Sequence, residues 1–172
     1  MPDAEELAPL EIAGRTFARL QLATVAGGAG LVGTYLLPWV EIVGPVFPED
    51  ADIGDEASPD AAEDVVEEGT IAASEIVVYP EVVAAMGLTL VLLSLFFWHR
   101  WIHLAVMFVG FAGAGIALLM REFLRNEEAL LEVGDYVGFG SSFEPAVGLW
   151  VTLGVSVILI GVGFAAFLDT FD

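Results

Sequence analysis

Hydrophobic residues gather in four long stretches of the chain, with polar and acidic segments between them. The stretches are Leu20–Val40, Val82–Trp98, Trp101–Met120 and Ala146–Leu168, and none of them contains Asp, Glu, Lys or Arg. A helix needs about 20 apolar residues to cross the roughly 30 Å hydrocarbon core of a bilayer. The pattern therefore predicts an all-α membrane protein, a bundle of four transmembrane helices.

The polar segments divide the rest of the chain. The second and third stretches are joined by only two residues, which predicts a helical hairpin. The remaining segments are an acidic leader at 1–19, an acidic loop at 41–81, an amphipathic segment and loop at 121–145, and a tail at 169–172.

Two polar segments keep apolar residues at helical spacing. In the leader this spacing favours a short interfacial helix. After Met120, the apolar residues from Phe123 to Leu131 predict that the third helix extends beyond the membrane or breaks into an amphipathic piece. Gly134 is the expected stop, and a loop follows it.

The loop at 41–81 carries 13 carboxylates and no Lys, Arg or His. Its flanks, Trp39–Val43 and Glu75–Tyr79, are rich in β-branched and aromatic residues, which suit strands. They either pair as a short β-hairpin on the membrane or form the ends of the adjacent helices. We favour the second interpretation, which places Pro80 in a first helical turn.

Charge adds a second property to this picture. The chain is 57% hydrophobic, yet its formal net charge is −20, and all five of its cations are arginines. Dense carboxylates keep a surface hydrated in multimolar salt, which screens their repulsion. We favour such a halophilic adaptation over a cation-binding role at ordinary salt. Non-specific cations are expected at the acidic loop, whereas nucleic acid and anionic lipid need basic patches.

The arginines also predict the orientation in the cell membrane. Four spans place both termini on one side, together with Arg15, Arg19 and Arg100, whereas Arg121 and Arg125 lie on the other. Cytoplasmic segments carry the excess of positive charge, and the acidic loop has none to retain it there. We therefore predict a multi-pass protein with cytoplasmic termini and an extracellular acidic loop.

Small residues recur in the spans at intervals of four. This spacing lets helix backbones approach closely, which matters in lipid because no hydrophobic effect draws helices together there. The same seams can join protomers, so a homo-oligomer or a larger membrane complex is expected. The predicted packing positions are Ala26, Gly30, Gly33, Gly110, Gly113, Ala114, Gly148, Thr152, Ser156 and Gly161.

Aromatic residues stand near the ends of the spans. Their rings settle at the level of the lipid headgroups because each has an apolar body and a polar edge. The predicted interface anchors are Tyr35, Trp39, Trp98, Trp101 and Trp150.

Several kinds of chemistry lack the residues they need. There is no cysteine, so disulfides, thiolate metal sites and cysteine nucleophiles are excluded. His99 and His103 have the spacing of a metal pair, but further ligands are distant in the sequence, and we interpret both as interfacial imidazoles. The run from Asp50 to Asp55 departs from the calcium-loop pattern at its glycine. We therefore expect no catalytic residues, no metal and no cofactor.

The spans contain no Asp, Glu, Lys or Arg, and most of their few polar side chains are hydroxyls. Proton relays and ion-coupled transporters keep ionisable groups within the bundle. A serine or threonine hydroxyl can instead bond to the preceding turn of its own helix. A hydrophilic path through one protomer is therefore not expected.

The layout resembles the small uncharacterised four-span membrane proteins of haloarchaea. The resemblance rests on an LPW exit from the first span (Leu37–Trp39), an acidic outer loop, and a GLW motif in the last span (Gly148–Trp150). It implies a membrane location and no particular activity. The claudins share the layout of four spans with strands in the first outer loop, but their paired loop cysteines are missing here.

Two hypotheses of function follow from these observations. The first is a non-enzymatic accessory, assembly or scaffold subunit that acts through helix packing and an acidic outer loop. The alternative is a component of an oligomeric transporter or channel whose path forms between protomers.

Overall fold

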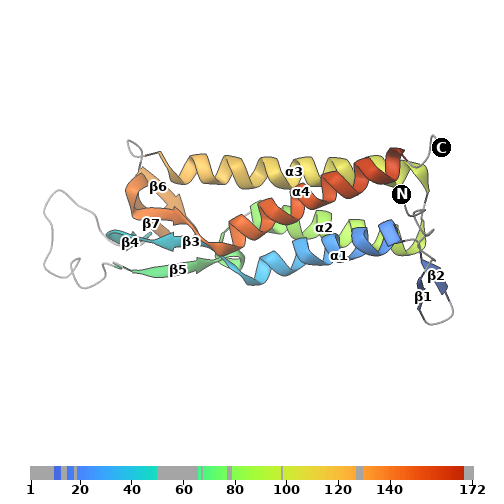
Figure 1. Ribbon diagram of the computed structural model, residues 1–172. Coiled ribbons are helices and arrows are strands. Elements are labelled where there is room, and N and C mark those ends of the chain that lie inside the picture. The colour runs from blue at the N-terminus through green and yellow to red at the C-terminus, as the bar shows by residue number, and fades with distance from the viewer. Residues whose placement is uncertain are drawn as a thin grey trace, which may run out of the picture.

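A computed structural model describes the protein at residues 10–12, 15–17, 19–49, 66, 68–76, 79–97, 99–126 and 130–168, and four helices contain most of these residues. The helices lie side by side as an elongated bundle (Figure 1). They are α1 (Arg19–Gly33), α2 (Tyr79–Phe96), α3 (Arg100–Leu124) and α4 (Val147–Leu168).

Among the described residues, three helices are long and apolar enough to cross a membrane. They are α2, the Trp101–Leu124 part of α3, and α4. Helix α1 has 15 residues, short of the roughly 17–25 that a span needs. It continues as a 3-10 turn, η1 (Thr34–Leu36), and the chain then becomes extended at Leu37 because the following proline disfavours helical backbone. The structure thus shows a mostly helical protein with three candidate spans and a shorter fourth helix.

Six short strands form a second region at one end of the helices, which we call the β platform (Figure 1). It consists of two antiparallel three-stranded sheets that combine the connection before α2 with the connection before α4. One sheet has the order β5 (Gly69–Ala72), β3 (Pro38–Ile42), β8 (Phe143–Pro145), and the other has the order β4 (Val46–Pro48), β7 (Tyr136–Phe139), β6 (Leu130–Val133).

The first flank of the acidic loop is a strand, so the favoured interpretation of it as a helix end was wrong. Trp39 to Ile42 belong to β3. Their partner is β5 rather than the predicted segment Glu75–Tyr79, because Glu75 lies in a 3-10 turn, η3 (Ala73–Glu75), and Tyr79 opens α2. Pro80 does lie in the first turn of α2, as predicted.

The segment after α3 also differs from its prediction. Leu130 and Leu131 lie in β6 instead of a helix, and the expected loop contains β7, the 3-10 turn η4 (Gly140–Ser142) and β8. Gly134 has a φ of +62°, the left-handed conformation that glycine adopts without steric cost. It opens a two-residue turn between Val133 and Tyr136, which are paired in β6 and β7.

The opposite end of the bundle holds another hairpin. Strands β1 (Leu10–Ile12) and β2 (Arg15–Phe17) pair antiparallel, where the sequence predicted an interfacial helix. This hairpin lies at the end of the bundle where α1 begins and α4 ends, and the platform lies at the other end (Figure 1).

One hydrophobic core runs from the helices into the platform. Its helical part includes Leu31, Leu90 and Leu159, and its platform part includes Trp39 and Phe143, all of them buried. The platform is therefore a continuation of the bundle rather than a separate unit.

Candidate functional site: helix seams and the platform junction

Helices α1 and α2 meet through two glycines. A Cβ built on Gly28 would lie 2.8 Å from the Gly87 carbonyl oxygen, and one built on Gly87 would lie 2.6 Å from the Gly28 carbonyl oxygen. Such distances are shorter than real side chains tolerate. The two backbones are therefore in direct contact, and no larger residue fits at either position.

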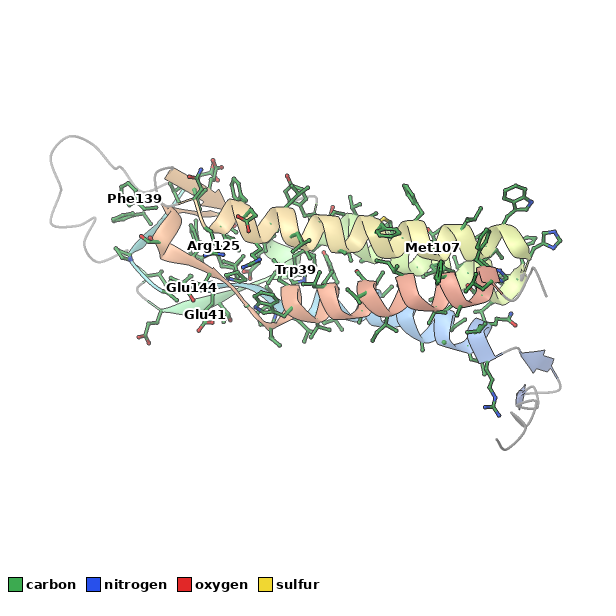
Figure 2. The ribbon with its side chains drawn as sticks, turned by 45° about the horizontal axis from the view of Figure 1, so that its top comes forward. Trp39, Glu41, Met107, Arg125, Phe139 and Glu144 are labelled. Carbon is green, nitrogen blue, oxygen red and sulfur yellow. The ribbon has the colours of Figure 1, made fainter. Side chains whose placement is uncertain are left out.

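Helices α3 and α4 have a seam of the same kind. A Cβ on Gly110 would lie 2.8 Å from the Ser156 carbonyl oxygen, and one on Gly113 would lie 2.5 Å from the Ser156 hydroxyl oxygen. Further along, a Cβ on Gly163 would lie 2.6 Å from the Met107 side chain, which faces α4 (Figure 2). The seam therefore extends over several turns of both helices.

The predicted stripe on α4 divides between two neighbours. A Cβ on Gly148 would lie 2.6 Å from the Pro38 carbonyl oxygen, so Gly148 contacts the start of β3 and not a helix. The Thr152 hydroxyl donates to the Gly148 carbonyl oxygen over 2.9 Å, and Ser156 faces α3. The stripe therefore joins α4 to the platform at one end and to α3 at the other.

The other predicted packing positions have looser surroundings. A Cβ on Gly30 would be 3.4 Å from the Val155 side chain of α4, an ordinary contact. Ala26 is exposed and Ala114 is half-buried. A Cβ on Gly33 or on Gly161 would have no atom within 4 Å. Neither glycine packs against another helix of the chain, so the prediction of a helix seam was wrong at these two positions. Spacing of four was present at these positions, but they face away from the neighbouring helices.

Gly28, Gly87 and Gly163 are close-contact positions that our predicted set missed. Gly87 was overlooked because it stands alone among larger residues in its span, without a small residue four positions away. A single glycine in an otherwise bulky apolar run was the available signal. It costs helix stability, so its presence in a helix interior indicates a local steric requirement.

The aromatic anchors differ in exposure. Trp39 is 0% exposed and donates its indole N–H to the Thr34 carbonyl oxygen over 2.9 Å, so it is a core residue and not an interface anchor. Its position in β3 directs the ring into the junction between helices and platform (Figure 2). Trp101 and Trp150 are exposed and Tyr35 is half-buried, whereas Trp98 lies outside the described residues.

Polar groups inside the bundle bond mostly to backbone. The hydroxyls of Thr24, Thr34, Thr89 and Thr152 donate to carbonyl oxygens of the preceding turn, as predicted. The prediction was wrong for Ser94 and Ser156, whose buried hydroxyls have no hydrogen-bond partner among the described residues. Gln21, which the sequence analysis did not single out, is buried and donates to the Ser94 carbonyl oxygen over 2.6 Å, so it ties the start of α1 to the end of α2.

The two histidines occupy different environments. His99 is exposed at the N-cap of α3, whereas His103 is only 7% exposed, so the interpretation of both as interfacial imidazoles was wrong for His103. The described part of the chain contains no group of three or more His, Cys, Asp or Glu side chains placed to hold a metal ion. The Asp50–Asp55 run lies outside it.

Carboxylates gather on the first sheet of the platform. Glu41 of β3 and Glu144 of β8 are direct cross-strand partners, and both are exposed (Figure 2). Glu41 and Glu68 also line an open groove of about 840 Å³ beside β5. The groove therefore offers two exposed carboxylates to the predicted non-specific cations.

A second cavity, of about 530 Å³, lies where the end of α3 meets the start of α4 and β8. It brings together Arg121, Arg125, Ser141, Glu144 and Trp150. The guanidinium of Arg121 is 5.7 Å from the centre of the Trp150 ring, within range of a cation–π interaction. We call this cavity the arginine cavity.

Comparisons with protein-family models, with curated proteins and with solved structures found no match for this chain.

Proposed function

We propose that the chain is a four-span membrane protein without enzymatic activity, an accessory or assembly subunit that presents the β platform at the membrane surface. The observation that carries this proposal is the continuity of the core between bundle and platform. Trp39, Phe143 and Leu149 are each at most 1% exposed where the two regions meet. A platform fixed in this way is suited to holding a partner in a defined position.

The fourth span in this proposal is α1 with η1. The chain has no charged residue between Arg19 and Glu41. Helix α1 packs against α2 through Gly28. It packs against α4 through Gly27, whose Cβ would lie 2.5 Å from the Leu159 side chain. A helix placed inside such a bundle needs less than the full hydrocarbon thickness, because local thinning of the bilayer and extended flanks can complete the crossing.

The proposed orientation places the platform outside and both termini in the cytoplasm of a cell that lives in high salt. The arginine distribution and the acidic outer segments support it. The cysteine-free chain allows a direct test with single Cys substitutions. An impermeant maleimide should label Glu68→Cys in intact cells and spare His99→Cys, which leaves every arginine in place. The reverse pattern would invert the orientation.

The platform has an exposed aromatic residue that suits contact with a partner. Phe139 of β7 is 57% exposed and projects at the outer part of the platform (Figure 2). Exposed aromatic residues contribute much of the binding energy of protein interfaces. Phe139 is thus the residue whose change should weaken binding without disturbing the core.

The test is affinity purification from native membranes in mild detergent at molar salt. We expect a protein partner in constant ratio to the natural chain, reduced at least several-fold by Phe139→Ser. Phe108→Ser, also on an exposed site but in the middle of α3, is the matched control and should retain the partner. A chain that purifies alone, as a homo-oligomer with a polar seam between protomers, would favour the transporter alternative instead.

A further inference from the structure

We infer that the arginine cavity binds the phosphodiester headgroup of an anionic lipid whose headgroup carries a hydroxyl group. The starting observation is the concentration of scarce positive charge. The chain has five arginines against 25 carboxylates, and two of the five line this one cavity. The acidity of the whole chain led us to expect no binding of anionic lipid. At this cavity, however, two arginines line the surface.

The arginines are placed by local structure. Arg121 lies in the last turn of α3 and Arg125 is the C-cap of the same helix, so their side chains project from neighbouring turns. A helix C-terminus also favours cationic side chains. The ion pair of Arg121 with Glu122 is 3.8 Å long and partly exposed, and such pairs contribute little. Arg121 can therefore exchange this partner for a phosphate oxygen.

The height of the cavity along the helices points to a lipid headgroup. Trp150 lies in the first turns of α4 and is 47% exposed, as expected of a ring at the membrane interface. On the side of Arg121 toward the middle of α3, the helix exposes Leu118 and Leu119, which suit contact with lipid tails. The guanidinium groups thus lie where the apolar surface ends and the phosphates of a bilayer begin.

The polar groups of the cavity indicate the class of headgroup. Guanidinium groups bind phosphate oxygens in a bidentate geometry, which a lysine cannot reproduce. The Glu144 carboxylate would repel a bare phosphate but can accept a hydrogen bond from a hydroxyl group, and Ser141 can do so as well. A phosphodiester with a glycerol-like headgroup satisfies all four side chains.

The inference requires only that α3 and α4 span the membrane, and it does not depend on the accessory role. A chain that purifies without a protein partner would leave it intact. Conversely, a failure to bind lipid would leave the accessory role untouched.

The experiment is a thermal unfolding series on the purified full chain in detergent. Phosphatidylglycerol, phosphatidylcholine and inorganic phosphate are added separately at equal concentration. At ~100 times its dissociation constant, one bound lipid should raise Tm by roughly 5–10 °C. We expect this shift with phosphatidylglycerol only. Arg121→Gln and Arg125→Gln should lose it, and Arg19→Gln, an exposed arginine at the opposite end, should retain it.

Two results would overturn the inference. A shift of the same size with inorganic phosphate, lost in the same arginine variants, would mean a free-phosphate site instead of a lipid site. A shift with phosphatidylglycerol that persists in both variants would place the lipid elsewhere. Should the arginine variants fail to fold, native mass spectrometry of the natural chain decides, because equal retention of phosphatidylglycerol and phosphatidylcholine would exclude the site.

Discussion

The bundle and the platform are stabilised in opposite ways. The helices meet where side chains are smallest, at Gly28 with Gly87 and at Gly110 with Ser156. The platform instead surrounds two of the largest buried side chains, Trp39 and Phe143. In lipid, burying a leucine gains little over lipid contact, so close backbone approach must supply the attraction. Beyond the membrane, removing aromatic surface from water is itself the driving force.

Replacement of Trp39 by alanine should have the largest effect on stability. It removes a fully buried indole and one of the two donors to the Thr34 carbonyl oxygen, which keeps the bond from the Leu37 N–H. Truncation of a buried aromatic residue costs about 3–5 kcal/mol. The free energy of unfolding in detergent measures this loss. Phe97→Ala is the control, since its side chain is 65% exposed, and should change stability by less than about 0.5 kcal/mol. Equal losses of stability in the two variants would show that the buried position of Trp39 contributes nothing specific to stability.

A larger side chain at a helix seam should destabilise the bundle, as truncation of Trp39 should destabilise the platform. Gly87→Leu forces the α1 and α2 backbones apart, at a cost of about 1–3 kcal/mol by analogy with overpacked cores. Gly33→Leu has open space around it and should be neutral or raise stability by up to about 1 kcal/mol, because glycine is a poor helix former. Thermal unfolding of both variants distinguishes them by sign. If Gly87→Leu were as stable as the natural chain, close contact between α1 and α2 would not contribute to stability.

Three of the helices could be predicted closely from sequence, whereas the first predicted span, Leu20–Val40, runs past the end of α1 at Gly33. Of the platform, only the strand character of Trp39–Val43 was recognised, as the less favoured alternative. An uninterrupted apolar run depends only on local composition, and the predicted Val82–Trp98 differs from α2, Tyr79–Phe96, by a few residues. Leu130 and Leu131 fit helical and strand patterns equally well. Their strand conformation depends on pairing with β7 and, through it, β4, whose residues are far away in the sequence.

The packing sites were predictable only in part for a related reason. Spacing of four identifies positions that share one side of a helix, and it found Gly110 and Ser156, which lie in the α3–α4 seam. It does not specify which side faces a neighbour, so Gly33 and Gly161 had the spacing without the contact. That choice depends on how each helix is rotated against the others. Trp39 shows the same limit, because its burial is produced by β3 and not by the adjacent span.

The smallest effect should come from the paired carboxylates of the platform. Glu41 and Glu144 lie directly opposite each other on β3 and β8 and are exposed to solvent. Like charges in this arrangement are destabilising, by about 0.2–1 kcal/mol in most sheets. Glu41→Gln should therefore raise the free energy of unfolding at ~0.1 M salt. At 1 M salt the Debye length falls to about 3 Å, so the gain should disappear.

Glu132→Gln provides the control for this pair. Glu132 is also exposed on a platform strand, but its cross-strand partner is Val137, so Glu132→Gln makes the net charge less negative without relieving a direct repulsion. Equal gains in stability in both variants would assign the effect to net charge alone. A gain in stability from Glu41→Gln that persists at 1 M salt would show that its cause is not charge repulsion. The cost of Gly87→Leu should be the same at both salt concentrations, because a steric contact between backbones within lipid is not screened. The effect of salt would then distinguish a contribution from the platform, which is exposed to water, from one within the bundle, which is not.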